Sequence, residues 1–141
     1  PVYGTKLALT LAENKMRENN VNSYIFNSVK PSSVIKLGCF SVEFIHVNHS
    51  IADACAIAVR TPVGIVYHSG DFKLDVTPID GDMMNITRLG EIGKKGTLLL
   101  MCESTNAERG GYTESEKKVG ESFENLFLRY LIKSGSRLVK D

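Results

Sequence analysis

Hydrophobic and polar positions follow two different periods along this chain of 141 residues. From about Thr5 to Asn19, apolar residues recur at helical spacing, which predicts an amphipathic helix ended by two consecutive asparagines. Short strands are then expected at 23–29 and 34–38, on either side of a Pro-Ser-Ser turn. The chain therefore begins with a helix and continues into a sheet.

The stretch CFSVEFIHVN, residues 39–48, alternates with a period of two and predicts a further strand. Phe44 and His46 then share one face, which we take as the apolar face, while Ile45 and Val47 lie on the other. We interpret His46 as an interior histidine of the sheet that is hydrogen-bonded by a neighbour.

The rest of the pattern predicts a hairpin, two helices and one more strand. Strands at 54–61 and 64–70 form the hairpin, a short helix over 84–93 is closed by a glycine, and 96–103 is a continuous apolar strand of the buried kind. A T-x-x-E capping box at Thr113 and Glu116 begins a long helix that runs to about Lys133. This order predicts a mixed sheet covered by helices, in the α/β or α+β class.

Composition limits the possible classes of protein only in part. With 43% hydrophobic residues and a net charge of +1, the chain can form one core, and its charge neither predicts nor excludes nucleic acid. There is no apolar run of membrane-spanning length and no signal segment, so we expect a soluble, cytoplasmic protein. Cys39, Cys55 and Cys102 show no close pairing, and we expect them to be buried as small apolar residues.

Three residues that follow predicted strands could carry chemistry: His49, Asp71 and Glu103. An imidazole and a carboxylate are common ligands of hydrolytic metal ions, and Gly70 before Asp71 would allow close approach of the backbone. On spacing alone, the commoner alternative is that His49 is a solvated loop residue and Asp71 caps a turn. Glu103 could orient a histidine or a water, or could simply belong to a turn capped by its neighbours.

The other histidines are better explained as structural. In an extended strand, His46 and His49 point to opposite faces, so they do not form a ligand pair unless the strand bends. His68 belongs to the strand GIVYHSG and is expected to be packed there. No GxSxG, P-loop or GxGxxG motif is present, which leaves serine hydrolases, P-loop nucleotide hydrolases and Rossmann proteins without support.

Four stretches carry a resemblance to a known family: PVYGTKLALTL, VEFIHVNHSIADACAIAV, GIVYHSGDFKLD and ESTNAERGGYTESEKKVGES. The chain resembles the middle part of the ribonuclease J family, within the β-CASP branch of the metallo-β-lactamase superfamily. The resemblance covers nearly the whole chain. It implies part of a metallo-β-lactamase αββα sandwich over residues 1–103 and the beginning of a β-CASP domain over 104–141.

The resemblance also implies a role for each candidate residue. His49 matches a histidine ligand of one ion in a two-metal centre, and Asp71 matches the aspartate that bridges both ions. Glu103 matches an acidic catalytic residue that helps position a histidine, and Ser104 and Thr105 would lie near the scissile phosphate. His46, Asp53 and His68 are left as structural residues.

The implied activity is hydrolysis of RNA phosphodiesters in RNA processing and decay, including that of ribosomal RNA. Family members act as endonucleases and as 5′-to-3′ exonucleases on mainly single-stranded RNA, with zinc, manganese or magnesium in the site, as homodimers or homotetramers.

The family's His-x-His-x-Asp-His ligand cluster is absent from this chain, both of whose ends look cut from a longer one, and would lie before Pro1. We therefore expect the isolated chain to be inactive and to bind metal weakly. The alternatives are another β-CASP or metallo-β-lactamase phosphodiester hydrolase, and a non-catalytic module that binds RNA or protein.

Overall fold

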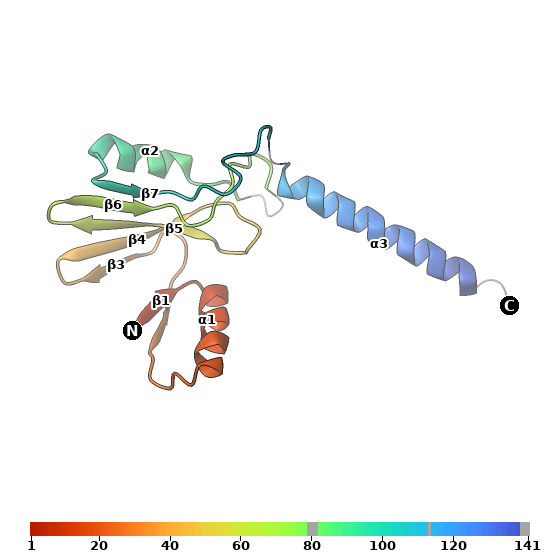
Figure 1. The fold of residues 1–141 in the computed structure, drawn as a ribbon, viewed down its shortest axis with the longest axis horizontal. Helices are drawn as coiled ribbons and strands as arrows, with labels where there is room; N and C mark the ends of the chain where they lie inside the picture. Colours follow the sequence, from red (N-terminus) through yellow and green to blue (C-terminus); the bar gives the residue numbers. More distant parts are fainter. Residues whose placement is uncertain (79–81, 113, 139–141) are drawn as a thin grey trace.

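A five-stranded sheet forms the centre of this computed structural model, which describes residues 1–78, 82–112 and 114–138 (Figure 1). The strands lie side by side in chain order, and the first four are antiparallel, whereas the last pairs parallel with its neighbour. They are β3 (Val34–Leu37), β4 (Phe40–His46), β5 (Cys55–Thr61), β6 (Gly64–His68) and β7 (Leu99–Met101). The α/β or α+β class expected from the sequence is confirmed, as is the hairpin of β5 and β6.

A second, smaller unit precedes this sheet. Strands β1 (Val2–Gly4) and β2 (Phe26–Ser28) pair in parallel and are connected by helix α1 (Lys6–Glu18). The helix expected from Thr5 to Asn19 is confirmed, and these two residues are its caps. The sequence pattern missed β1, because three residues are too few to show a period.

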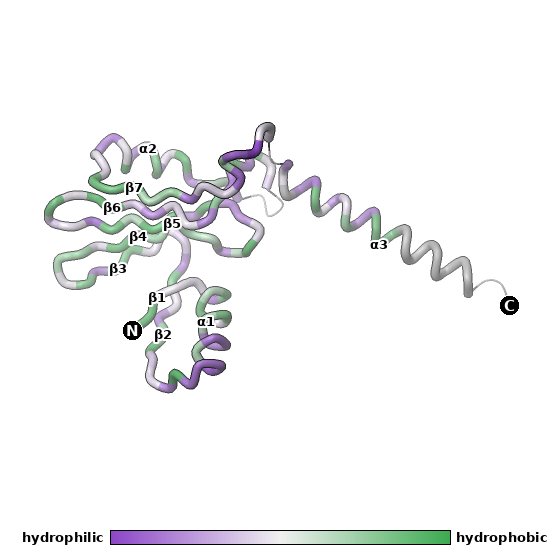
Figure 2. The backbone as a smooth tube through the Cα atoms, in the orientation of Figure 1, coloured by the Kyte–Doolittle hydropathy of each residue, from purple (hydrophilic) through white to green (hydrophobic). Residues whose placement is uncertain are grey.

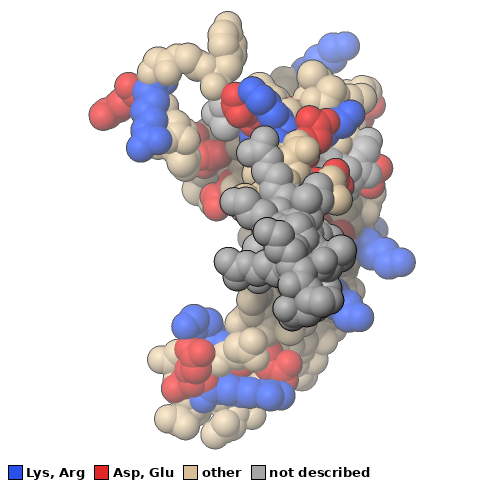
Figure 3. All heavy atoms as spheres, turned by 90° about the vertical axis from the view of Figure 1, so that its right-hand side faces the viewer, with Lys and Arg blue, Asp and Glu red and all other residues tan. Residues whose placement is uncertain are grey.

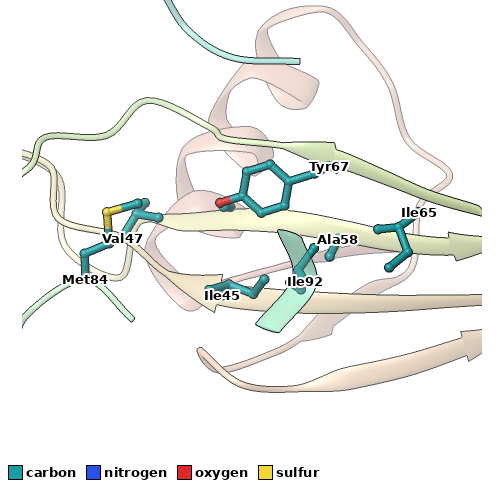
Figure 4. Close-up of a cluster of buried hydrophobic side chains, with 8 residues drawn as sticks. Ile45, Val47, Ala58, Ile65, Tyr67, Met84 and Ile92 are labelled. Carbon is teal, nitrogen blue, oxygen red and sulfur yellow. The ribbon is translucent and has the colours of Figure 1, made fainter. Parts of the chain in front are cut away.

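Helix α2 (Ile86–Lys95) covers one face of the sheet and overlaps the helix expected over 84–93, but Gly93 lies inside the helix and Gly96 is its C-cap. A hydrophobic cluster fills the space beneath it (Figure 4). Its buried members are Ile45, Val47, Ala56, Ala58, Ile65, Tyr67, Met84 and Ile92. The alternation expected for β4 is therefore correct, but the expectation that Phe44 and His46 mark the apolar face is wrong, because the cluster lies on the face of Ile45 and Val47. The docking of α2 decides which face is covered, and periodicity alone does not reveal it.

An ion-pair network fastens α2 to the sheet from within this covered face. Glu43 is 6% exposed, and its carboxylate contacts Arg88 Nε at 2.6 Å and Arg88 Nη2 at 3.0 Å. Arg60 Nη2 of β5 lies 2.6 Å from Glu43 Oε2, and Arg88 also pairs with Glu91 on α2. Hydrogen bonds from Arg88 in particular hold the pKa of Glu43 below its usual 4.5, although burial opposes this effect.

Strand β7 differs from the expectation of a buried strand. It is an edge strand of the described sheet, and Leu99, Leu100 and Met101 are 50%, 61% and 42% exposed although all three are hydrophobic (Figure 2). The expectation for the cysteines is also wrong at two positions. Cys39 lies in the exposed turn between β3 and β4, and Cys102 lies exposed just after β7, while Cys55 is half-buried.

Helix α3 (Glu116–Leu138) extends away from the sheet (Figure 1). The Ser115 hydroxyl accepts a hydrogen bond from the NH of Lys117 and donates to the buried Asp75 carboxylate, so it anchors the start of this helix. The expected capping box of Thr113 and Glu116 lies outside the described residues and side chains. The expected domain boundary after residue 103 falls between β7 and α3 and stays a prediction. None of the helices in the described part of the chain has the length and apolar character needed to span a membrane.

The Glu43 network generates a stability prediction. Glu43→Gln removes the charge that faces two arginines, so we expect the free energy of unfolding at pH 7 to fall by about 1–3 kcal/mol. Since the folded pKa lies below 4.5, the stabilisation is present above that pH and is lost as the pH falls through the folded value. The loss of stability on acidification should therefore be smaller in the variant, as measured by urea unfolding between pH 3 and 7.

Glu18→Gln is the matched control, because Glu18 pairs with Lys15 at a site where the side chains are 59% and 77% exposed. Such pairs contribute about 0–1 kcal/mol. Equal effects of the two substitutions would contradict the role assigned to Glu43.

Candidate functional site

Three loops begin at the same edge of the sheet, and each carries one of the candidate residues. The register pairs His46 with Cys55, Ile57 with His68, and His68 with Met101. Because β4 and β6 are both antiparallel to β5, and β7 is parallel to β6, the carboxyl ends of β4, β6 and β7 meet at one edge. His49, Asp71 and Glu103 follow these three ends, as expected from the sequence.

His49 has an unusual environment for a loop histidine. Its ring is half-buried, and the Nδ1 atom is buried without a hydrogen-bond partner among the described residues. A buried nitrogen without a partner costs free energy. The alternative of a solvated loop histidine does not describe this half-buried ring, and the ring nitrogen is suited to bind a ligand.

The turn before Asp71 has a backbone shape that requires glycine. Gly70 has φ +61°, and a Cβ atom at this position would lie 2.8 Å from the carbonyl oxygen of Cys55. The Gly70 NH donates to His68 Nδ1 at 2.9 Å, and the Ser69 NH donates to the Met101 carbonyl at 2.9 Å. These contacts hold the turn against β5 and β7, and they leave the Asp71 side chain exposed.

Glu103 connects the loop after β7 with the turn that carries Asp71. Its Oε1 accepts the Phe72 NH at 3.1 Å, its Oε2 accepts the Thr105 NH at 3.0 Å, and its own NH donates to the buried Ser69 hydroxyl at 3.0 Å. Hydrogen bonds from the Thr105 side chain, from the Phe72 NH and from the Thr105 NH lower the pKa of Glu103, and the charge of His49 acts in the same direction. In this structure Glu103 positions the neighbouring turn.

Ser104 and Thr105 lie exposed in the turn that follows β7. The Ser104 carbonyl accepts the NH of Ala107, and a hollow of about 430 Å³ is lined by Ser104 and by residues 106–109. A larger hollow of about 580 Å³ lies beside His46 and the segments 74–76 and 82–87, and it includes neither His49 nor Asp71.

The residues interpreted as structural have structural contacts. His46 is half-buried, with Nε2 3.2 Å from the carbonyl oxygen of Asp82, as expected for a hydrogen-bonded histidine of the sheet. His68 is exposed, so the expectation that it is packed is wrong, although its ring does accept the Gly70 NH. Asp53 lies in a turn with φ +57°.

The described residues do not by themselves make up a metal site. They contain no group of three or more His, Cys, Asp or Glu side chains placed to hold one ion. His49, with its buried unpartnered nitrogen, and the exposed Asp71 carboxylate fit two ligand positions, whereas a catalytic zinc takes three protein ligands and an open position.

Two residues that organise this edge, Asn48 and Ser69, are not among the candidates that the sequence predicts. Both are buried, at 5% and 3% exposure, and both hydrogen-bond to backbone groups of other loops. Their positions next to His49 and Gly70 were the available signal, but a polar residue at a strand end is more often solvated.

The chain is similar to known proteins in sequence and in fold. No family model matches the chain. It is 43% identical over 128 residues to ribonuclease J of Synechocystis sp., 40% over 129 residues to ribonuclease J of Helicobacter pylori, and 38% over 132 residues to ribonuclease J of Thermus thermophilus.

These matches cover 89%, 90% and 92% of this chain but only 20%, 19% and 23% of the relatives, so the chain spans about a fifth of their length. A crystal structure of a protein of unknown function from Enterococcus faecalis V583 matches with a TM-score of 0.64 and 22% identity, over 92% of this chain and 33% of that one. At that identity, the structural match bears on the fold alone.

The turn at Gly70 generates a second prediction. Gly70→Ala should lower the free energy of unfolding by about 2–4 kcal/mol, because it adds a steric clash to the cost of about 1–2 kcal/mol for a left-handed residue. The displaced turn should also speed hydrogen exchange at the Phe72 NH. Urea unfolding and NMR exchange measure both effects.

Gly38→Ala is the control that separates the two causes, since Gly38 has φ +62° with nothing within 4 Å of the added Cβ. It should show only the conformational cost, without a change at Phe72. Equal destabilisation by the two substitutions would exclude a close approach of Gly70 to Cys55.

Proposed function

We propose, from the homology of this chain with a segment of ribonuclease J, that it is part of a metal-dependent ribonuclease that hydrolyses RNA phosphodiesters. The observation that carries the proposal is the buried, unpartnered Nδ1 of His49, at the sheet edge where the loops with Asp71 and Glu103 also begin. Residues 1–103 would form part of a metallo-β-lactamase sandwich, and the β-CASP domain would begin at 104.

In this proposal His49 and Asp71 are ligands of a two-ion centre, with zinc, manganese or magnesium as the metal. Such ions would supply activation of water and neutralisation of charge on the phosphate oxygens. Glu103 holds the Asp71 turn through the Phe72 NH, so Asp71 keeps its place when substrate enters. Ser104 and Thr105, exposed beside Glu103, would contact the substrate backbone.

The substrate we propose is single-stranded RNA, cleaved both internally and from the 5′ end, in a cytoplasmic homodimer or homotetramer. Proteins hold single strands by phosphate contacts and base stacking. On the face drawn in Figure 3, lysines and arginines are interspersed with acidic residues and do not gather in one basic patch. Homology therefore supports RNA as the substrate more strongly than the charge on this face does.

A chimera tests the proposal. This chain would replace the homologous segment of Helicobacter pylori ribonuclease J, to which it is 40% identical, and cleavage of 5′-labelled single-stranded RNA would be followed. We expect cleavage, and we expect Asp71→Asn to reduce it about 100-fold or more, because a bound ion contributes several kcal/mol. Asp53→Asn is the matched control: it removes a carboxylate from the neighbouring loop and retains a residue that tolerates φ +57°.

The isolated chain should bind zinc weakly and should not cleave RNA, since its described residues provide two ligand positions. Tight, stoichiometric zinc in the 141-residue chain, or cleavage abolished by Asp71→Asn there, would contradict this expectation. A folded chimera that cleaves equally well with Asn at position 71 would contradict the ligand role. It would favour another hydrolase site or a non-catalytic binding module.

A further inference from the structure

Asn48 is a buried amide between the core residue Val47 and the candidate ligand His49. It is 5% exposed, and both ends of its side chain bind backbone groups of a segment more than thirty residues away. The Nδ2 atom donates to the Asp82 carbonyl at 2.5 Å, and Oδ1 accepts the Met84 NH at 2.7 Å. A buried amide held at both ends in this way has one orientation available.

The main chain of Asn48 joins a third segment. Its carbonyl oxygen accepts the NH of Lys73 at 2.7 Å, two residues after Asp71. Asn48 therefore links the end of β4, the turn of Asp71 and the segment 82–84 that leads into α2. His46, two residues before Asn48, contributes to the same junction, because its carbonyl accepts the Asn85 NH at 3.3 Å.

This junction matters for His49 because no hydrogen bond from another described residue orients the His49 ring. Metal-binding histidines are usually oriented by a hydrogen bond from their second ring nitrogen or by the backbone that carries them. Among the described residues neither ring nitrogen of His49 has a hydrogen-bond partner, so the orientation of the ring depends strongly on the peptide before it. That peptide belongs to Asn48.

We propose that Asn48 is a positioning residue of the candidate site: its side chain holds the 82–84 backbone and thereby fixes both the peptide before His49 and the turn of Asp71. The part of this inference that concerns metal rests on the proposed function. The other part, that Asn48 couples the peptide before His49 to the turn of Asp71, rests on the hydrogen bonds alone.

Two substitutions separate the contacts of the amide. Asn48→Asp keeps an acceptor for the Met84 NH and places a carboxylate oxygen against the Asp82 carbonyl. Asn48→Leu has similar volume and removes both side-chain hydrogen bonds. If the leucine variant does not fold, the aspartate variant still carries the test, because it loses only one contact.

Thr61→Val is the control. The Thr61 hydroxyl accepts the NH groups of Val63 and Gly64 and donates to the Gly64 carbonyl, so it also satisfies backbone groups. It does so in the turn between β5 and β6, at the opposite end of the sheet from His49. A loss of stability without a change at the site is expected for this variant.

The first measurement needs no metal: hydrogen exchange at the Phe72 NH, which bonds to Glu103 and not to Asn48. We expect exchange about tenfold faster in both Asn48 variants than in Thr61→Val at matched free energy of unfolding. The second is a zinc titration of the 141-residue chain, followed by the imidazole NMR signals of His49. We expect apparent affinity about tenfold weaker in Asn48→Asp and unchanged in Thr61→Val.

The outcomes distinguish the ligand role of His49 from the positioning role of Asn48. Faster exchange with weaker zinc binding supports both. If the unsubstituted chain shows no zinc at His49 even at millimolar concentration, the ligand role of His49 in this chain is overturned, and the exchange rates alone decide whether Asn48 positions the turn. Unchanged exchange at Phe72 overturns the positioning role, and so does zinc binding that is unchanged by Asn48→Asp.

Discussion

The pairing register of β4, β5, β6 and β7 is the constraint on which the site depends. Side chains along a strand alternate between faces, so a slip of one residue between β5 and β6 would exchange the buried and the open face. It would also move the Asp71 turn relative to the end of β4. The buried pairs Ile45–Ala56 and Ala58–Tyr67, together with Glu43 beneath α2, oppose such a slip. The core thus determines where the three loops begin.

Loops that leave a sheet expose backbone NH and carbonyl groups, which need partners wherever they are buried. At this edge, three side chains supply them: Asn48, Ser69 and Glu103, each for a loop other than its own. The turns with His49 and Asp71 are therefore held by their neighbours and need no contact with each other. Both oxygens of Glu103 are engaged in this way, which agrees with a positioning function for the acidic residue.

Sequence alone predicted the elements with a clear period, such as α1 and the β5–β6 hairpin, and it predicted that His49 and Asp71 follow strand ends. The sequence did not predict the features that depend on tertiary packing. The continuous apolar run of β7 is typical of a buried strand, yet β7 is the outermost strand of the described sheet and its side chains are exposed. Which face of β4 is covered depends on Arg88 and Ile92 of α2. Asn48 could not be predicted as a buried amide, because its hydrogen-bond partners are distant in the sequence.

A buried polar atom without a partner does not by itself identify a site, and this protein contains an informative counterexample. The Tyr67 hydroxyl is also buried and unpartnered among the described residues, but it lies in the hydrophobic cluster beneath α2, and burial raises its pKa to about 12. It stays protonated at neutral pH, in the apolar core (Figure 4). The His49 nitrogen differs because it lies at the end of the sheet where the loops with Asp71 and Glu103 also begin, and the Glu103 carboxylate holds the Asp71 turn. Location among oriented polar groups, more than the missing hydrogen bond itself, makes His49 the candidate ligand.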